Sequence, residues 1–446
     1  MKRKYFGTDG IRGAYGDSVL TDEFAFRLGR AVSQWMNGEG EDLIVAIGRD
    51  TRSSGPALLN AFACGLQAET HIRIIDLGVL PTPAIAVYVR NVGATLGVSI
   101  TASHNPAQDN GIKFFNSLGK KLTDGQEFEI ESLVDCIEEP DTIGEARVEA
   151  GSAGVSAYLD LLHPTLPEGS LEGFRIVVDT ANGAACNTTP VLLKALGAEL
   201  FVYGNEPNGT NINDGVGSQY PDHLGAKVIE HQAHLGIAHD GDADRLLICD
   251  ESGTVVPGDV LLGLLALQEL KHGRLKKNTL VATQQSNIGL DHTLEKVGAK
   301  VVRTSIGDRY VLEEMSKSGY NLGGESSGHI ITSDINSTGD GLAAALKLLA
   351  ILVEEKKPLS ELQSRVQLFP QISQAIAVSE KKPLEGVTEI QAVLTQLESE
   401  MGDTGRVLLR YSGTENKIRL LVEGEDAEAV EAWYRQLENT VRTHLT

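Results

Sequence analysis

The sequence has few aromatic residues and few cysteines, and it lacks a long uninterrupted hydrophobic run. Phe, Trp and Tyr make up 5% of the 446 residues, and there are 4 cysteines. The cysteines form no C-x-x-C pair, which argues against a zinc site and is typical of buried free thiols in a reducing compartment. The apolar run 341–353 is interrupted by Lys347 and is too short to span a bilayer, so we expect no transmembrane helix.

Basic residues are fewer than acidic residues. The chain has 39 Lys and Arg against 61 Asp and Glu, a formal net charge of −22. A surface of that sign repels nucleic acid and anionic membranes, so we expect neither as a partner. An anionic substrate must then meet a local cluster of Arg or Lys. The N-terminus is charged and no apolar segment follows it, which argues against a signal peptide and predicts a cytoplasmic protein.

Hydrophobic patterning predicts several domains. A helix beginning near Thr21 and short apolar runs separated by helix-length segments are typical of β-α-β units around mainly parallel sheets. The runs fall into three sets, which are 43–47, 72–77 and 96–100, then 174–178, 200–203 and 235–238, then 279–282, 301–302 and 320–322.

The last part of the chain has a different pattern. From Val407 it is strand, loop, strand and helix, and one helical face carries Val430, Trp433, Leu437 and Val441. The predicted fold class is therefore α/β, with three related mixed α/β sandwich domains followed by a C-terminal α+β domain. The predicted domains are 1–153, 154–252, 253–367 and 368–446.

The densest polar motif is the loop 240–245, Asp-Gly-Asp-Ala-Asp-Arg, between two apolar strands. Asp240, Asp242 and Asp244 alternate, and on a tight loop their oxygens could converge on one hard cation such as Mg²⁺. A solvated acidic turn is the alternative. Because α/β proteins bind ligands at strand ends, the position favours a metal site.

A second motif, 101–106, directly follows the predicted strand 96–100. Its Ser103 could be a nucleophile or a phosphate carrier, with His104 beside it as a proton-handling group. The alternative is a serine that satisfies backbone groups of the turn. Lys113 could neutralise phosphate or donate a proton if it is desolvated, and otherwise it is an ordinary lysine at a strand edge.

Two further loops carry polar groups. In the glycine-rich loop 323–329, Glu325 and Ser327 suit sugar hydroxyls and His329 can exchange a proton, whereas a flexible loop is the alternative. The loop 410–416 lies between two predicted strands and could hold phosphate, whereas a hairpin turn is the alternative. Its candidate phosphate contacts are Arg410, Ser412, Gly413, Thr414 and, downstream, Arg419.

Taken in order with the N-terminal stretch Gly7-Thr8-Asp9-Gly10-Ile11-Arg12-Gly13, these four loops resemble the α-D-phosphohexomutase superfamily over essentially the whole chain. The stretches 306–311, Ile-Gly-Asp-Arg-Tyr-Val, and 211–215, Asn-Ile-Asn-Asp-Gly, are similar to its phosphoglucosamine branch. The resemblance implies a heart-shaped molecule with a central cleft that reversibly converts glucosamine 6-phosphate to glucosamine 1-phosphate, a step toward UDP-N-acetylglucosamine. A phosphomannomutase or phosphoglucomutase is the nearest alternative, and a non-catalytic sugar-phosphate-binding protein is the second.

The resemblance also implies residue roles. Ser103 would carry a phosphate that holds one Mg²⁺ together with the three aspartates, while Arg12, Lys113 and Arg245 add positive charge. Lys113 and His329 would transfer protons, and His104 would support the serine phosphate. The substrate would be bound by Arg245, Glu325, Ser327, Arg410, Ser412, Gly413, Thr414 and Arg419. A glucosamine 1,6-bisphosphate intermediate, a small phosphosugar as the partner molecule and a monomer or homodimer complete the expectation.

Two departures from the superfamily pattern affect these loops. Many members have glycine where this chain has Ala243, so a need for positive φ there would force the metal loop onto a different path. Proline is common where this chain has Tyr411 and Asn416, which bears on the rigidity of the phosphate loop. Neither departure removes a predicted ligand.

Overall fold

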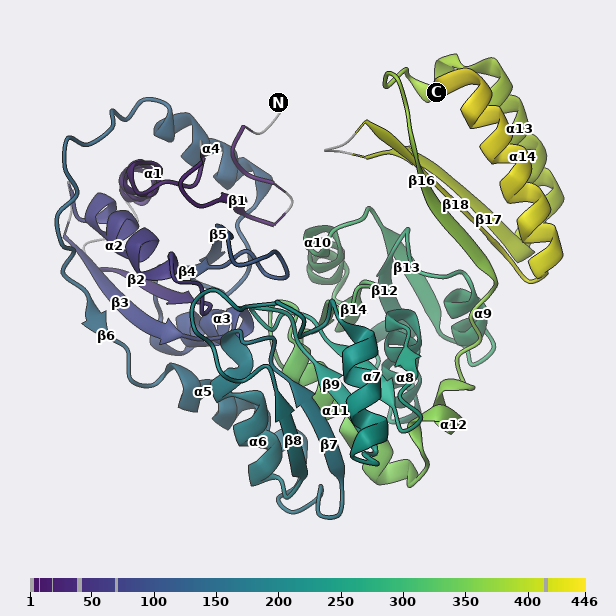
Figure 1. The fold of residues 1–446 in the computed structure, drawn as a ribbon, viewed down its shortest axis with the longest axis horizontal. Helices are drawn as coiled ribbons and strands as arrows, with labels where there is room; N and C mark the ends of the chain where they lie inside the picture. Colours follow the sequence, from purple (N-terminus) through teal and green to yellow (C-terminus); the bar gives the residue numbers. More distant parts are fainter. Residues whose placement is uncertain (1–3, 8, 18, 38–41, 69–70, 413–415) are drawn as a thin grey trace. The chain divides into compact units, whose positions relative to one another are not determined.

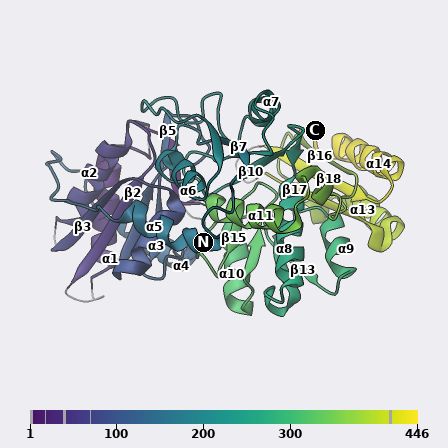
Figure 2. The same ribbon diagram turned by 90° about the horizontal axis from the view of Figure 1, so that it is seen from below.

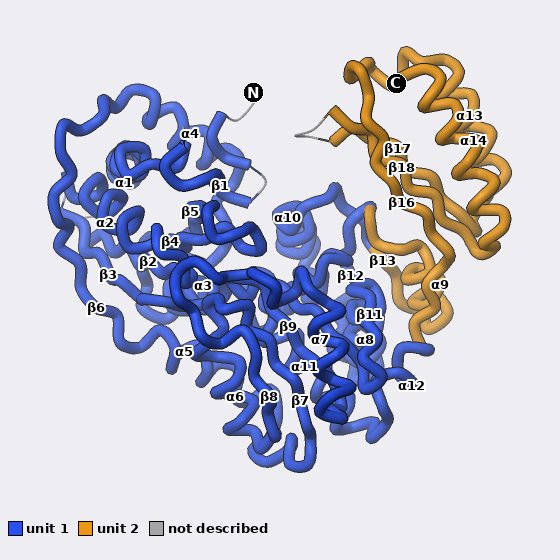
Figure 3. Tube along the Cα trace, in the orientation of Figure 1, with its two compact units in different colours: residues 1–284, 302–364 blue, residues 285–301, 365–446 orange. Residues whose placement is uncertain are grey.

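The computed structural model describes residues 4–7, 9–17, 19–37, 42–68, 71–412 and 416–446. The chain forms two compact units, residues 1–284 with 302–364 and residues 285–301 with 365–446 (Figure 3). Three sheets with a strong parallel component occupy the earlier part of the chain, and an antiparallel sheet lies in the second unit. The predicted α/β-then-α+β order is confirmed. The four domain boundaries remain a prediction.

The first sheet runs in the order β1-β5-β4-β2-β3-β6 (Figure 1). Its strands are β1 (Ile11–Ala14), β2 (Leu43–Arg49), β3 (Ile72–Val79), β4 (Leu96–Ile100), β5 (Asp109–Asn116) and β6 (Glu149–Ala150). Its helices are α1 (Asp22–Trp35), α2 (Gly55–Leu66), α3 (Thr82–Val92) and α4 (Asp124–Val134). The helix predicted to begin near Thr21 is α1. Thr21 caps it, because the Thr21 hydroxyl accepts a hydrogen bond from the Phe24 amide at 3.1 Å.

Helices cover this sheet with apolar side chains. Residues of α1, α2 and α4 form one core with the strands, including Leu28, Phe62 and Ile130. Helix α3 packs on β2 and β4, and it lies side by side with α5 (Gly154–Leu162) (Figures 1 and 2). These helices hold β4 fully buried, so the loop after it starts from a rigid strand end.

The second sheet has the order β11-β10-β9-β7-β8 and the third has the order β13-β12-β14-β15. The second comprises β7 (Arg175–Asp179), β8 (Glu199–Tyr203), β9 (Leu235–Ala238), β10 (Leu247–Asp250) and β11 (Val255–Val256), with helices α6 (Thr189–Ala195) and α7 (Pro221–Glu230). The third comprises β12 (Thr279–Thr283), β13 (Lys300–Thr304), β14 (Leu322–Gly324) and β15 (Ile330–Thr332), with helices α8 (Gly258–Lys271), α10 (Asp308–Ser318), α11 (Gly341–Glu355) and α12 (Leu359–Gln363).

One strand arrangement occurs in all three sheets. A parallel pair is followed by an antiparallel strand in β2-β4-β5, in β7-β9-β10 and in β12-β14-β15. The three related α/β domains that the sequence predicts are therefore confirmed. The serine, acidic and glycine-rich loops each lie in the connection between the last two strands of such a triple, so they occupy equivalent positions.

The second unit is built on the antiparallel sheet β16-β18-β17. Its elements are β16 (Gln371–Ala377), α13 (Thr388–Met401), β17 (Gly405–Tyr411), β18 (Lys417–Gly424) and α14 (Ala427–Leu445), and it includes α9 (Gly289–Glu295). The predicted face of the last helix is largely correct, since Val430, Leu437 and Val441 are buried while Trp433 is half-buried beside the buried Tyr434.

Two sequence expectations concern cysteines and membranes. Cys186 and Cys249 are buried, but Cys64 is half-buried and Cys136 is exposed, so the prediction of four buried thiols is wrong for two of them. Hydrophobic spacing could not separate these environments, because burial of a single small side chain depends on the packing around it. Within the described ranges, no helix combines the length and apolar character needed to cross a membrane.

Candidate active site

Ser103 lies one turn after β4 in an unusual backbone conformation. Its φ is 54°, in the left-handed region that side chains other than glycine rarely adopt. The surroundings hold it there, because the Ser103 amide donates to Thr101 Oγ1 at 2.9 Å and its carbonyl accepts from Asn213 Nδ2 at 2.8 Å and from Arg52 Nη2 at 3.2 Å. Backbone strain of this kind is retained where the fold over-determines it, often at functional sites.

The Ser103 hydroxyl does not serve the turn. Oγ donates a hydrogen bond to Asp240 Oδ2, and His104 Nδ1 lies 3.3 Å from the same oxygen of Ser103. The interpretation of this serine as a group that satisfies turn backbone is therefore wrong. The bond joins the loop after β4 to the loop after β9, and the side chains of Ser103 and Asp240 are fully buried.

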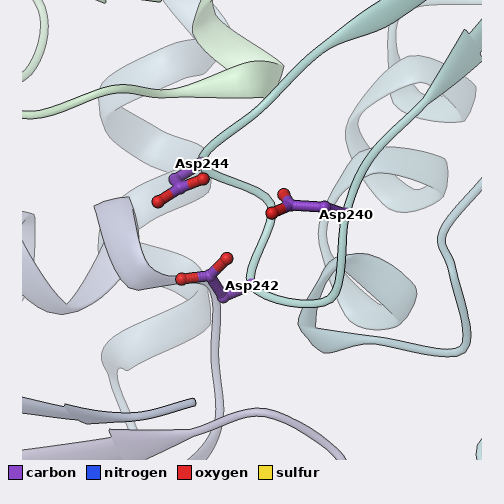
Figure 4. A group of neighbouring side chains, drawn as sticks. All are labelled: Asp240, Asp242 and Asp244. Carbon is purple, nitrogen blue, oxygen red and sulfur yellow. The ribbon is translucent and has the colours of Figure 1, made fainter. Parts of the chain in front are cut away.

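The three aspartates of the loop after β9 are buried together. One carboxylate oxygen from each of Asp240, Asp242 and Asp244 lies within 4.8 Å of the others, and Figure 4 shows the three groups turned toward one another from a single loop. Burial and the charges of the two neighbouring aspartates raise the pKa of Asp240 to about 7. The alternative of a solvated acidic turn is wrong, because these side chains are not in water.

The donor set fits a hard divalent cation. Asp242 Oδ1 and Asp244 Oδ1 are buried and, among the residues that the structure describes, accept no hydrogen bond. Buried carboxylate oxygens without donors are costly, and carboxylate oxygens are the ligands that Mg²⁺ prefers. The loop can therefore bind a metal, with Asp240, Asp242 and Asp244 as its candidate ligands.

Ala243 completes this loop in the left-handed conformation, with φ of 58°. The expectation that alanine would divert the loop onto a different path is wrong. The Ala243 methyl group is buried, and the residue keeps the left-handed conformation. This conformation costs about 1–2 kcal/mol for a residue with a Cβ.

Lys113 is buried on β5, between β1 and β4, so it is not a lysine at a sheet edge. Its ammonium contacts Asp242 Oδ2 at 2.8 Å, Asp9 Oδ2 at 2.9 Å and Asp244 Oδ2 at 3.2 Å. Burial alone would lower the pKa of Lys113, but these carboxylates outweigh it and raise the pKa above its ordinary value. The side chain is therefore a fixed positive charge beside the aspartates.

Arg12 and Arg245 bring two further positive charges. Arg12 on β1 pairs with Asp9, and Arg245 Nε lies 3.9 Å from Asp244 Oδ1. Both side chains are about one fifth exposed, at 21% and 23%, so they border the buried aspartates and remain reachable from solvent. The predicted clustering of Arg12, Lys113 and Arg245 near the acidic loop is present.

The two predicted histidines differ in protonation. Burial would lower the pKa of His329, but Asp244 at 3.6 Å and Asp308 at 3.3 Å raise it to about 9. Burial and the nearby Arg245 and Arg12 lower the pKa of His104 to about 4. At neutral pH His329 therefore carries a proton that it can donate, whereas His104 is neutral.

The glycine-rich loop lies in the same compact unit as the serine and acidic loops. The Gly307 amide donates to Glu325 Oε1 at 3.0 Å, and burial raises the pKa of Glu325. Ser327 is exposed, whereas His329 is buried. The Gly307 amide thus orients Glu325, and Ser327 is exposed to solvent. Their contacts with a sugar remain a prediction.

In the second unit, Arg410 on β17 and Arg419 on β18 are directly opposite each other in the antiparallel register. Burial and the Arg419 charge lower the pKa of Arg410. Like charges opposite each other destabilise a sheet, so a bound anion would offset their repulsion. The buried Ser412 follows Arg410, and its carbonyl accepts from Lys381 at 2.7 Å; the predicted contacts Gly413 and Thr414 lie outside the described residues.

Several residues at this site were not singled out from the sequence. Thr82 Oγ1 donates to Asp242 Oδ2 at 2.7 Å, and the Arg52 guanidinium donates to the carbonyls of Ser103 and Asn105. Asn213 lies in the 211–215 stretch, so a signal for it existed, but Thr82 and Arg52 belong to no pattern. Their contacts arise from residues far away in the sequence.

Comparison with known proteins identifies the family. Four models described as domains I, II, III and the C-terminal domain of phosphoglucomutase/phosphomannomutase match residues 3–141, 156–253, 257–369 and 374–439. The chain belongs to the phosphoglucomutase/phosphomannomutase family. Membership agrees with the site, since the serine, acidic and glycine-rich loops fall within the matches to domains I, II and III, respectively.

Relatives of this phosphoglucomutase/phosphomannomutase family member cover its whole length. It is 45% identical over 450 residues to the phosphoglucosamine mutase of Geobacter metallireducens, with 99% of each chain covered, and 46% identical over 453 residues to that of Nitratidesulfovibrio vulgaris, with 100% of each covered.

Solved structures share the fold. A family protein from Burkholderia thailandensis superposes with a TM-score of 0.81 at 24% identity, covering 98% of this chain and 97% of that one. The N-acetylphosphoglucosamine mutase of Aspergillus fumigatus, in complex with GlcNAc-6P and magnesium, gives 0.67 at 18% identity, covering 100% and 96%. The predicted fold class, three α/β domains followed by a C-terminal α+β domain, is thus confirmed for this phosphoglucomutase/phosphomannomutase family member.

Proposed function

We propose that this chain is a phosphoglucosamine mutase, which interconverts glucosamine 6-phosphate and glucosamine 1-phosphate. Its relatives of that name, at more than 40% identity over the full length, support this choice of sugar. The observation that carries the chemistry is the hydrogen bond from Ser103 Oγ to Asp240 inside a buried cluster of carboxylates. A hydroxyl in that place can accept and return a phosphoryl group beside a cation site.

In the proposed reaction the active enzyme carries a phosphate on Ser103. The bond from phosphorus to Ser103 Oγ breaks as a bond forms to the free sugar hydroxyl. The sugar hydroxyl loses its proton and Ser103 Oγ takes one up, and glucosamine 1,6-bisphosphate results. The bisphosphate turns end for end, and its other phosphoryl group then returns to Ser103. The sugar leaves with its phosphate on the opposite carbon, and the enzyme is phosphorylated again.

Charge stabilisation is the main task of the surrounding residues, because phosphoryl transfer depends on positioning and on neutralising the transferred group. Lys113, Arg12 and Arg245 would supply fixed positive charge beside the acidic loop. Asp240, Asp242 and Asp244 would hold Mg²⁺ together with the Ser103 phosphate, and the ion would supply further neutralising charge there.

His329 is the proposed proton donor to the leaving oxygen, since its raised pKa keeps it protonated at neutral pH. Lys113 is the less favourable of the two predicted proton-transfer groups, because three carboxylates stabilise its ammonium. The neutral His104 lies within hydrogen-bonding reach of Ser103 Oγ and would orient the phosphoserine.

Substrate recognition would use the two ends of the sugar phosphate. Glu325 and Ser327 would contact ring hydroxyls. In the second unit, Arg410, Ser412 and Arg419, with Gly413 and Thr414, would bind the phosphate that is not being transferred. Either phosphate of the bisphosphate suits such a site, which the turning of the intermediate requires.

A coupled assay with glucosamine, glucose and mannose phosphates tests the choice of sugar, and Ser103→Ala tests the carrier role. We expect the highest kcat/KM with glucosamine phosphate, and a loss of nearly all activity in a folded Ser103→Ala. The exposed Ser132→Ala is the control and should keep wild-type activity. A preference for glucose or mannose phosphate would favour the phosphomannomutase/phosphoglucomutase alternative. Absence of phosphate on Ser103 in intact-protein mass spectra, with no turnover, would favour a sugar-phosphate-binding protein.

A cytoplasmic location and a monomeric or homodimeric state remain predictions.

A further inference from the structure

The turn 307–309 connects three parts of the site and has no role in the reaction described so far. Gly307 has φ of 129°, a conformation that favours glycine, and its amide donates to Glu325. Asp308 begins α10 and pairs with Lys121 and with His329. The next residue, Arg309, pairs with the buried Glu127 of α4 at 2.5 Å. Three consecutive residues thus contact the sugar loop, the histidine and the first α/β domain.

Asp308 belongs to a closed ring of alternating charges. Lys113 pairs with Asp9 at 2.9 Å, Asp9 with Lys121, and Lys121 with Asp308. Asp308 lies 3.3 Å from His329 Nε2, and His329 Nδ1 lies 3.6 Å from Asp244 Oδ1. Asp244 closes the ring on Lys113 at 3.2 Å. The members are Lys113, Asp9, Lys121, Asp308, His329 and Asp244.

The ring brings together groups from all three α/β sequence segments, and most of its side chains are buried. The side chains of Lys113, Asp244 and His329 are 2%, 4% and 4% exposed, those of Lys121 and Asp308 are 7% and 11% exposed, and that of Asp9 is 20% exposed. Three carboxylates alternate with three cations, so the ring as a whole is neutral when His329 is protonated. Buried charges are tolerated when they are paired, and removal of one partner leaves the other uncompensated.

We infer that Asp308 is a positioning residue for phosphoryl transfer, which fixes His329 and, through Lys121 and Asp9, holds Lys113 against the acidic loop. The inference rests on the proposed mutase reaction, in which His329 and Lys113 act on the transferred group. Asp308 itself contacts neither Ser103 nor the three candidate metal ligands within the described contacts. Its effect on catalysis must therefore pass through the ring, and loss of its charge should misplace two functional side chains together.

The test compares Asp308→Asn, Asp308→Glu and Lys121→Met with wild type by steady-state kinetics. Asp308→Asn should lower kcat by about 10- to 100-fold with KM changed by less than about threefold, because misplacement by about 1 Å costs that much rate. Asp308→Glu keeps the charge and should recover most of the lost kcat. Lys121→Met should lower kcat much less in the Asp308→Asn variant than in the wild-type protein. The reason is that the two residues act through one network.

Glu269→Gln is the matched control. Glu269 is buried to a similar degree, pairs with Arg274 and Lys347 at 3.0 Å each, and lies on α8 outside the ring. It should lower thermal stability while kcat stays at the wild-type value.

The possible outcomes separate the positioning role from a structural role and from the proposed function. Wild-type kcat in Asp308→Asn, no recovery in Asp308→Glu, or fully multiplicative losses in the double variant would each overturn the positioning role. A kcat loss in Glu269→Gln equal to that in Asp308→Asn would also overturn it, because it would trace the effect to general destabilisation. Absence of mutase activity in wild type with all three sugar phosphates would instead reject the proposed function.

Discussion

Gly339 leaves no space for a side chain beside His329, because a Cβ at this position would lie 2.1 Å from His329 Nε2. The same nitrogen faces Asp308, so a methyl group at residue 339 would push the imidazole out of the ring of charges. Close backbone approach, and not a positive φ, is the reason for glycine here.

Gly339→Ala should therefore lower kcat by about 10- to 100-fold, the cost of a misplaced catalytic group. Overpacking should also destabilise the protein by about 1–3 kcal/mol, measured by thermal unfolding. Gly144→Ala is the control, since a Cβ there meets nothing within 4 Å and should leave kcat unchanged. Equal kcat in Gly339→Ala and Gly144→Ala would show that the position of His329 does not matter for turnover.

Asp242→Asn should weaken metal binding, because Asp242 Oδ1 is one of the two buried carboxylate oxygens of this loop that accept no hydrogen bond within the described residues. We expect the Mg²⁺ concentration for half-maximal activity to rise by at least about tenfold, the loss typical of a disturbed metal environment. Mn²⁺ binding followed by electron paramagnetic resonance measures the same change without turnover. Asp76→Asn, whose carboxylate pairs with Arg49 in the first sheet, is the control. Unchanged metal titrations in Asp242→Asn would argue against the acidic loop as the cation site.

Arg410→Ala should raise KM for the sugar phosphate by about 10-fold or more, because a charge-assisted hydrogen bond to phosphate contributes about 1.5–3 kcal/mol. The variant should fold normally, since removal of one of two opposed arginines relieves repulsion between β17 and β18. The exposed Arg435→Ala on α14 removes the same charge elsewhere in this unit and should leave KM unchanged. Wild-type KM in Arg410→Ala would place the phosphate contact elsewhere.

Alkaline pH should destabilise the metal-free protein through His329. Its pKa in the folded protein is about 9, raised from an ordinary value of 6.5, so its contribution to stability is fully present below pH 6.5 and is lost as pH rises through 9. Each tenfold gain in proton affinity on folding corresponds to about 1.4 kcal/mol, so the stability lost over this range amounts to about 3 kcal/mol.

Urea unfolding in EDTA at several pH values measures this effect. The free energy of unfolding of wild type should fall between pH 6.5 and about 9 relative to that of His329→Gln. His272→Gln, which removes an exposed histidine on another surface, should keep the wild-type dependence. Parallel curves for wild type and His329→Gln would mean that folding does not raise the pKa of His329.

Local pattern was a good guide to the strands that carry the site. The predicted runs 96–100 and 235–238 coincide with β4 and β9, because fully buried strands appear as uninterrupted apolar segments. The run 320–322 was less accurate, since the strand begins at Leu322. Short apolar segments next to a glycine-rich loop do not define their own ends.

The sequence by itself determined the three repeated strand patterns, the loops after them and the oxygen-rich chemistry of residues 240–244, because periodicity and residue type are local properties of the chain. The tertiary structure alone decided which charges meet. Asp9, Lys121 and Asp308 are far apart in the sequence and carry no shared local signal, yet burial forces each to find a partner of opposite sign. Desolvation and neighbouring charge, which depend on the whole fold, also decided that His329 is protonated while His104 is neutral.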